Sequence, residues 1–92
     1  MFIGYCRAEF FIPHSRSLKD RRSVVSRIKQ RIRNKFNVSV AEKPSDKWQR
    51  CELAFSCVNY TKDRVEGMLN QIEEALSACY DIQILDVAKE IL

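Results

Sequence analysis

Basic side chains are concentrated in one short stretch of the chain, where their spacing suits contact with phosphate groups. Residues 16–35 hold nine Lys or Arg against the single acid Asp20, a local charge of +8, while the whole chain carries only +4. The nine are Arg16, Lys19, Arg21, Arg22, Arg27, Lys29, Arg31, Arg33 and Lys35. Clustered Lys and Arg bind nucleic-acid backbones electrostatically and need no base-reading geometry to do so.

These cations form two ridges if the stretch is helical. At roughly 100° per residue, the ridges are Arg22, Lys29 and Arg33, beside the apolar stripe, and Arg27, Arg31 and Lys35, at i, i+4 and i+8. Like charges at i, i+4 repel by roughly a few tenths of a kcal/mol, which favours an anionic partner over a merely solvated face. The alternative is neutralisation by the second helical segment, because residues 63–90 hold seven acids against two bases.

Arg21 falls inside the apolar stripe near the predicted helix start, and two interpretations stay open. Its stem can pack against the core while its guanidinium reaches solvent at the helix end. Alternatively, it joins Ser15, Ser17 and the free N–H groups of the helix start, with Arg16 and Lys19, in holding a phosphate.

Few residues of the sequence are candidates for catalysis, and the pattern around each of them is weak evidence for it. His14 is the only histidine, and no acid is placed to orient it toward the serine that follows, so a surface-loop histidine is the simpler interpretation. Glu9 and Glu52 share one face of the predicted sheet with Arg7 and Arg50, so cross-strand ion pairing explains them without acid–base chemistry. We expect no enzymatic activity.

The four cysteines, Cys6, Cys51, Cys57 and Cys79, offer disulfide or zinc chemistry only in principle. No two have the spacing of roughly two to four residues found in a metal knuckle. Each continues an apolar pattern, as small buried cysteines do. With two glycines in the chain there is also no glycine-rich phosphate loop. We expect free buried thiols, no metal and no cofactor.

The elements that position these residues follow from the periodicity of apolar side chains. Alternation predicts strands over 2–12, 38–42, 47–58 and 80–87, and apolar residues at helical spacing predict helices over 18–34 and 62–78. Ser17 is the expected N-cap of the first helix and Thr61 that of the second. Residues 88–92 are expected to form a tail.

The order strand, helix, strand, strand, helix, strand predicts an α+β, ferredoxin-like βαββαβ sandwich. Each helix has a single apolar stripe, so both helices cover one face of a four-stranded antiparallel sheet whose first and third strands are central. Ninety-two residues suffice for one domain, 1–92, and for one core. No apolar run approaches the length of about 18 residues that crosses a bilayer, so we expect a cytoplasmic protein with no membrane partner.

The other face of the sheet is expected to stay uncovered, with mixed aromatic and charged residues. Its candidate interface residues are Tyr5, Phe11, Trp48 and Arg50, because exposed aromatics and arginines are typical of interface cores. Tyr5 and Trp48 also resemble the base-stacking aromatics of RNA-recognition sheets, but residues 47–52 lack the glycine and paired aromatics of that module. Homodimerisation or capture of a protein partner is therefore the alternative function.

Three stretches of the sequence resemble a known family. They are Ile12-Pro13-His14-Ser15-Arg16-Ser17-Leu18-Lys19-Asp20-Arg21-Arg22-Ser23, the segment Arg33-Asn34-Lys35-Phe36-Asn37-Val38-Ser39-Val40-Ala41-Glu42, and Trp48-Gln49-Arg50. In register and over nearly the whole chain, the sequence is similar to the YlxP-like family of small bacterial proteins, a domain of unknown function. It departs from the usual family pattern at His14, Asp20 and Cys51.

The resemblance implies a ferredoxin-like fold and no established enzymatic activity. Because family genes often neighbour genes of translation and ribosome maturation, it also implies an association with RNA or the ribosome. Together with the charge pattern, it leads us to expect a non-enzymatic protein that binds RNA or a ribonucleoprotein. The expected phosphate contacts are Lys19, Arg21, Arg22, Arg27, Lys29, Arg31, Arg33 and Lys35.

Overall fold

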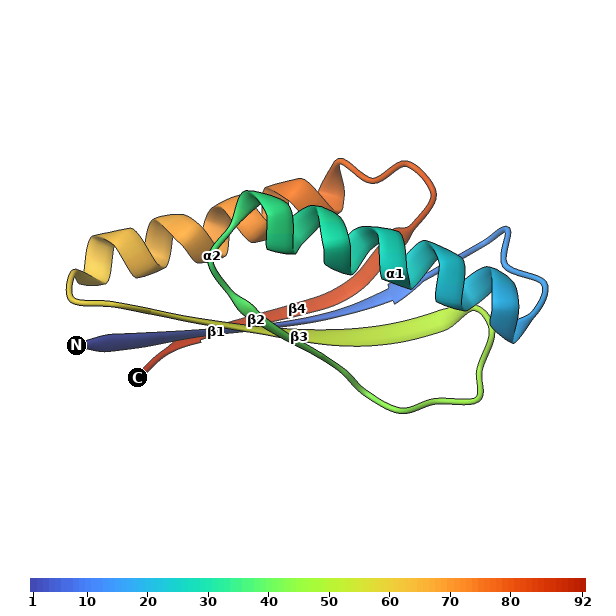
Figure 1. Ribbon diagram of the computed structural model, residues 1–92, viewed down its shortest axis with the longest axis horizontal. Helices are drawn as coiled ribbons and strands as arrows, with labels where there is room; N and C mark the ends of the chain where they lie inside the picture. Colours follow the sequence, from blue (N-terminus) through green and yellow to red (C-terminus); the bar gives the residue numbers. More distant parts are fainter.

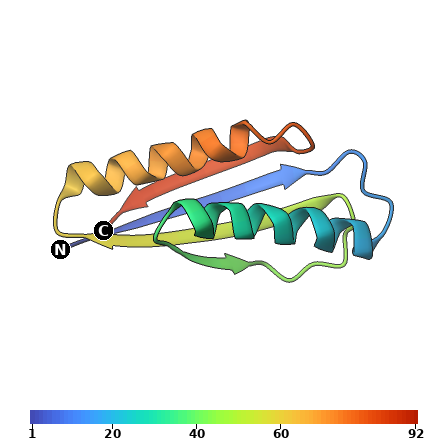
Figure 2. The same ribbon diagram turned by 45° about the horizontal axis from the view of Figure 1, so that its top comes forward.

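The computed structural model describes residues 1–92, and its elements follow the predicted order (Figure 1). They are β1 (Phe2–Phe11), α1 (Leu18–Lys35), β2 (Ser39–Glu42), β3 (Arg50–Asn59), α2 (Lys62–Ser77) and β4 (Gln83–Ile91). The strands form one antiparallel sheet in the order β2-β3-β1-β4. Both helices lie on the same face of this sheet, α1 on the β2 side and α2 over β1 and β4 (Figure 2). The prediction of a ferredoxin-like fold is confirmed.

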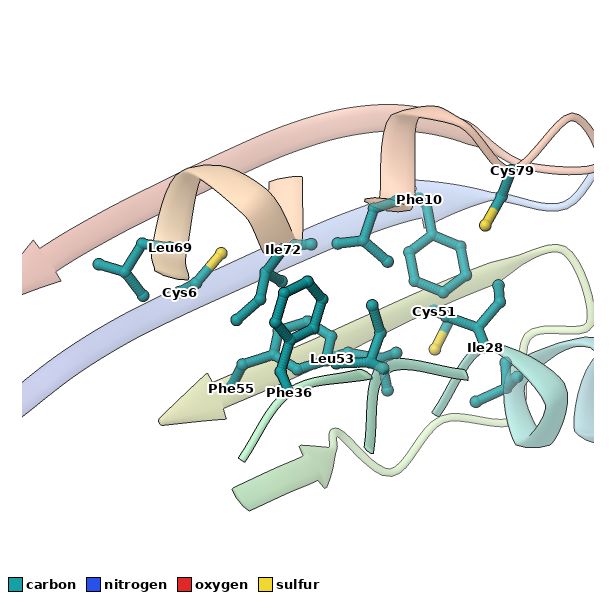
Figure 3. Packing of buried hydrophobic residues seen from close by; sticks show 14 of the residues in the cluster. Cys6, Phe10, Ile28, Phe36, Cys51, Leu53, Phe55, Leu69, Ile72 and Cys79 are labelled. Carbon is teal, nitrogen blue, oxygen red and sulfur yellow. The ribbon is translucent and has the colours of Figure 1, made fainter. Parts of the chain in front are cut away.

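The alternating strands and the helix stripes meet in one core of 17 buried residues. Phe10 and Phe55 project from the two central strands toward Ile28 of α1 and Ile72 of α2 (Figure 3). All four cysteines lie in this core as free, buried thiols, as predicted.

The start of α1 is fixed by its capping residues. The Ser17 hydroxyl accepts a hydrogen bond from the Asp20 N–H at 3.0 Å, and the Asp20 carboxylate accepts one from the Arg16 N–H at 3.0 Å. This exchange resembles a capping box, with Asp in the place of Glu. Thr61 occupies the N-cap position of α2, but its side chain makes no capping hydrogen bond.

Three predicted strand boundaries differ from the structure by three or four residues, namely the start of β3 and both ends of β4. β3 begins at Arg50, not residue 47, so Trp48 lies in the bend before the strand rather than on the open face of the sheet. β4 runs from Gln83 to Ile91, so the residues expected as a tail are paired with β1 as far as Gly4↔Ile91. The register shifts where Leu85 is left without a partner, and this bulge interrupts the alternation that the prediction used.

The two helices of this fold, α1 and α2, differ from membrane-spanning helices. Neither of them combines the length and the apolar character that crossing a bilayer requires.

Candidate nucleic-acid interface

The rotation of α1 about its axis is fixed by four residues that face the sheet: Arg21, Val25, Ile28 and Ile32 are all buried. At roughly 100° per residue, the opposite side of the helix carries four neutral polar residues and one lysine. This polar strip is Ser23, Ser26, Gln30 and Asn34, with Lys19 at its start, and all five are exposed. Apart from the buried Arg21, the remaining cations of α1 flank the polar strip on both sides.

On the flank nearer β2, Glu42 neutralises two of the predicted phosphate ligands. Arg21 is only 4% exposed, its Nη1 donates to Glu42 Oε2 at 2.9 Å, and its Nε donates to the Arg50 carbonyl at 2.9 Å. Lys29 Nζ lies 3.1 Å from the other carboxylate oxygen of Glu42. Glu42 ends β2 beneath α1, so both cations turn inward toward it.

Arg21 therefore fits neither interpretation drawn from the sequence. Its guanidinium does not reach solvent, and it does not join Ser15 and Ser17 in a phosphate site, since the Ser15 hydroxyl donates to the Ser17 carbonyl at 3.2 Å. The prediction that Arg21 contacts phosphate is wrong, because desolvating a guanidinium is favourable only with a counter-charge and hydrogen-bond acceptors at hand. Glu42 and the Arg50 carbonyl supply both.

On the other flank, the loop between α2 and β4 approaches the cations. Arg27 forms an ion pair with Asp81. Arg31 Nη1 lies 4.0 Å from the Cys79 sulfur, a weak contact at the carboxyl end of α2, where a cation is favourable. Lys35 Nζ lies 5.5 Å from the centre of the Phe36 ring. This flank is thus partly neutralised, with one carboxylate serving one of three cations.

No acid of α2 forms an ion pair with a cation of α1. Glu73 of α2 pairs instead with Lys89 of β4 at 2.6 Å, a hydrogen bond that raises the pKa of Lys89 above its usual value. Neutralisation of α1 therefore comes from Glu42 and Asp81, which belong to a strand and a loop, rather than from the acidic helix considered in the sequence analysis.

Five of the eight predicted phosphate ligands are exposed and have no carboxylate partner. They are Lys19, Arg22, Arg31, Arg33 and Lys35. Arg16 adds a sixth exposed cation of this kind just before α1. These side chains frame the polar strip on a single rigid helix, which is an arrangement that can receive a row of anionic groups.

The open face of the sheet uses its charges internally. Arg7 pairs with Glu52 at 3.5 Å and with Asp86 at 3.1 Å, and Arg50 pairs with Glu9 at 3.6 Å, which confirms cross-strand pairing. Of the predicted interface residues on this face, Tyr5 and Phe11 are half-buried, and Trp48, displaced from the strand, is 52% exposed.

The residues considered for nucleophilic or metal chemistry lie on a loop or in the core of this fold. His14 is exposed on the loop after β1. Burial raises the pKa of the Cys51 thiol to about 12, so this thiol is protonated at neutral pH and is a poor nucleophile. No three side chains of the His, Cys, Asp or Glu types gather where they could hold a metal ion.

Two features of this site were not predicted from the sequence: the polar strip, and which carboxylates neutralise which cations of α1. The strip could have been found by placing Ser23, Ser26, Gln30 and Asn34 on the same helical projection as the cations. The pairing of Glu42 and Asp81 with α1 had no sequence signal, because it depends on where a strand end and a loop pack against the helix.

Comparison with known proteins gives one family and one fold. The model of the family described as "Protein of unknown function (DUF503)" matches residues 3–89. "Uncharacterized protein YlxP" of Bacillus subtilis (strain 168) is 37% identical over 71 residues, which cover 76% of this chain and 77% of that relative.

Two solved structures of designed proteins are similar to the chain. The de novo designed protein Foldit4 has a TM-score of 0.55 at 12% identity, covering 98% of this chain and 97% of its own. The de novo designed protein LFR1 1, with a ferredoxin fold, has a TM-score of 0.54 at 11% identity, covering 99% of this chain and 85% of its own. At such identities the likeness shows the fold alone.

Proposed function

The chain belongs to the DUF503 family of proteins of unknown function, and we propose that it is a non-enzymatic RNA-binding protein that holds the phosphate backbone of structured RNA, free or in a ribonucleoprotein. The exposed side of α1 is the contact surface. The observation that carries the proposal is the row of exposed cations without carboxylate partners along this helix, from Lys19 to Lys35.

The dimensions of this row suit a nucleic-acid backbone. Sixteen helical steps of roughly 1.5 Å separate Lys19 from Lys35, a length of about 24 Å. Over that length the flanks of α1 present positive charge, and the polar strip between them offers hydroxyl and amide groups. Side chains of Ser, Asn and Gln, together with Lys and Arg, are the usual phosphate contacts in protein–nucleic-acid complexes.

A purely solvated helix face is a weaker explanation of the same residues. A helix face of alternating acids and bases is solvated equally well, and each pair of opposite charges at i, i+4 also stabilises the helix by about 0.2–0.5 kcal/mol. In α1 the one acid, Asp20, is occupied with the helix start. The exposed cations therefore repel one another in the free protein, and an anionic partner relieves that repulsion.

The test is the salt dependence of binding to a labelled RNA hairpin, measured by fluorescence anisotropy. If about four phosphates are engaged, log K should fall with log salt at a slope of about −3 to −4. The double variant Arg22→Gln/Arg33→Gln should bind more weakly at each salt concentration, with a slope shallower by about 2. Its melting temperature should stay close to that of the parent, because both side chains are exposed.

A matched control separates a defined interface from general attraction. Lys62→Gln/Arg64→Gln removes two exposed cations from α2 and lowers the formal net charge from +4 to +2, as the first variant does. This control should keep the affinity and slope of the parent. If the affinity of the parent did not change with salt, or if both double variants lost affinity equally, α1 would not be the binding surface.

Homodimerisation over the open sheet face is the second candidate, with Trp48 as the observation that favours it. Its side chain is 52% exposed beside the end of that face, and tryptophan is enriched at interface centres. Sedimentation of the parent and Trp48→Ala tests it: a dimer that dissociates in the variant supports this interface, and a monomeric mass for both counts against it.

A further inference from the structure

We propose that Trp48 and Phe11 form a stacking site for an unpaired RNA base, at the end of the molecule where α1 begins. The proposal rests on the proposed function and deepens it, because it specifies RNA with single-stranded nucleotides beside the segment whose phosphates α1 holds.

The site is a shallow hollow that contains two aromatic side chains. A depression of about 500 Å³ is lined by Phe11, Asp46, Lys47, Trp48, Gln49 and Arg50. Trp48 is 52% exposed and Phe11 is half-buried on the open face of the sheet. The hollow therefore leaves an indole accessible to a flat apolar ligand.

Hydrogen bonds of Gln49 anchor the backbone next to Trp48. The Gln49 carbonyl accepts a bond from the Ile12 N–H at 2.7 Å. The Gln49 side-chain amide donates to the carbonyls of Pro13 at 3.4 Å and Ser15 at 3.2 Å. Trp48 is thus presented to solvent beside an anchored residue, which limits the backbone entropy lost when a ligand stacks on it.

The charges around the hollow favour an anionic ligand. Residues 43–50 hold Lys43, Lys47 and Arg50 against the single acid Asp46, a local charge of +2. Arg50 pairs with Glu9 at 3.6 Å, whereas no carboxylate pairs with either lysine. Of the two lysines, Lys47 lines the hollow with Trp48, and an accessible indole beside a lysine without a carboxylate partner matches the parts of a nucleotide, a flat base and a phosphate.

The stacking site is continuous with the start of α1. Arg21 of the first turn donates to the Arg50 carbonyl, and Gln49 reaches the carbonyl of Ser15, two residues before the N-cap Ser17. The segment after β2 and the beginning of α1 also lie at the same end of the molecule in both ribbon views (Figures 1 and 2). One RNA strand can therefore place phosphates along α1 and a neighbouring base on Trp48.

The experiment compares a single-stranded oligoadenylate with a fully paired, blunt-ended RNA duplex at one low salt concentration. Trp48 is the only tryptophan, so its fluorescence reports the stacking directly, while anisotropy of the labelled RNA reports binding. The single strand should quench Trp48, and Trp48→Ala should weaken single-strand binding by about 5- to 100-fold. Trp48→Phe, which keeps an aromatic face, should recover most of the loss. Affinity for the duplex should change less than about 2-fold in either variant, because its paired bases are not available to stack.

A matched control is Tyr60→Ala, which removes an aromatic side chain that is 85% exposed at the opposite end of β3. Ten strand residues place it about 33 Å away, so its affinity for both RNAs should equal that of the parent. Quenching by the single strand with unchanged affinity in Trp48→Ala would overturn the stacking site while leaving α1 as the phosphate surface. An equal loss of affinity for both RNAs in Trp48→Ala would likewise overturn the stacking site. So would a sedimenting mass of Trp48→Ala smaller than that of the parent, because it would show that Trp48 lies in a protein interface. If neither RNA binds, the proposed function fails and the stacking site fails with it.

Discussion

Replacing Glu42 by Gln should destabilise the fold by about 2–4 kcal/mol, because the change leaves a charged arginine buried without its counter-ion. The Arg21 side chain is 5% exposed, its Nη1 lies 2.9 Å from Glu42 Oε2, and its Nη2 has no partner. In the variant the amide oxygen of Gln can still accept from Nη1 and the Arg50 carbonyl from Nε, but neither of these acceptors carries the negative charge that balances the guanidinium.

The magnitude follows from the burial of the two partners. Breaking a buried ion pair by removing one member costs about 3–5 kcal/mol, because the other charge stays desolvated. Glu42 is 26% exposed, so water reaches part of the pair and lowers this figure. The loss of the Lys29 contact adds little, about 0–1 kcal/mol, because the Lys29 side chain is 25% exposed.

The assay is urea denaturation followed by circular dichroism, carried out as a double-mutant cycle. Arg21→Met removes the buried charge, keeps an apolar stem of similar length and leaves Glu42 with Lys29, so it should cost less than about 1.5 kcal/mol. The double variant Arg21→Met/Glu42→Gln should be more stable than Glu42→Gln alone. As a control, Glu66→Gln changes an exposed acid of α2 that has no ion-pair partner and should stay within about 0.5 kcal/mol of the parent.

Two results would refute this reasoning. One is a Glu42→Gln variant as stable as the control, which would mean that the Arg21 charge is solvated or otherwise compensated. The other is a double variant no more stable than Glu42→Gln. Arg21→Met should also bind the RNA hairpin as the parent does, since Arg21 does not reach the exposed side of α1.

Two further predictions concern the glycines and alkaline pH. Gly67→Ala should raise stability by about 0.5–1 kcal/mol in urea denaturation, because Gly67 lies inside α2 with open space around an added Cβ. Gly4→Ala should lower it by about 1–3 kcal/mol, because the new Cβ would lie 2.5 Å from Val65 Cγ1 and 2.9 Å from the Cys57 sulfur; the opposite order of the two variants would contradict the packing of α2 on β1. Burial raises the pKa of Cys51 from 9.0 to about 12. Above pH 9 the unfolded chain therefore releases a proton that the folded chain retains. Between pH 9 and 12 the free energy of unfolding should fall by up to about 1.4 kcal/mol per pH unit for this group. Cys51→Ala, though less stable at pH 8, should show a shallower fall, and parallel curves for parent and variant would contradict the assignment.

The fold could be predicted from the sequence where side-chain periodicity was unbroken. β1 alternates without interruption, so its buried residues were predicted correctly, and the two helix stripes placed both helices on one face of the sheet. The end of β4 could not be predicted in this way. At the bulge one residue, Leu85, shifts the side-chain parity of the strand relative to β1, and a pattern read at period two then changes face partway along.

The candidate site could be predicted only as a set of charges. Helical spacing placed the cations on α1 and separated Arg21, inside the apolar stripe, from Arg22, but it could not distinguish the cations that are paired from those that stay free. The distinction comes from tertiary packing: Glu42 arrives from β2 and Asp81 from the loop before β4, and each meets the cation that faces it. Such contacts join residues 21 and 54 positions apart, and no local pattern encodes them.

The paired and unpaired cations of α1 depend on each other. Glu42 and Asp81 lie on opposite flanks of the helix, one holding Arg21 and Lys29 and the other holding Arg27. Together with the buried apolar stripe, these ion pairs oppose rotation of α1 about its own axis in either direction. The residues between and beyond these ion pairs are thereby held toward solvent. Glu42 and Asp81 together contribute two negative charges, which still leave residues 16–35 with a formal charge of +6. Loss of the Glu42 pairs should consequently weaken RNA binding as well as folding, even though neither Arg21 nor Glu42 touches the RNA. That secondary loss should vanish in Arg21→Met, which removes the buried charge and leaves Lys29 paired with Glu42.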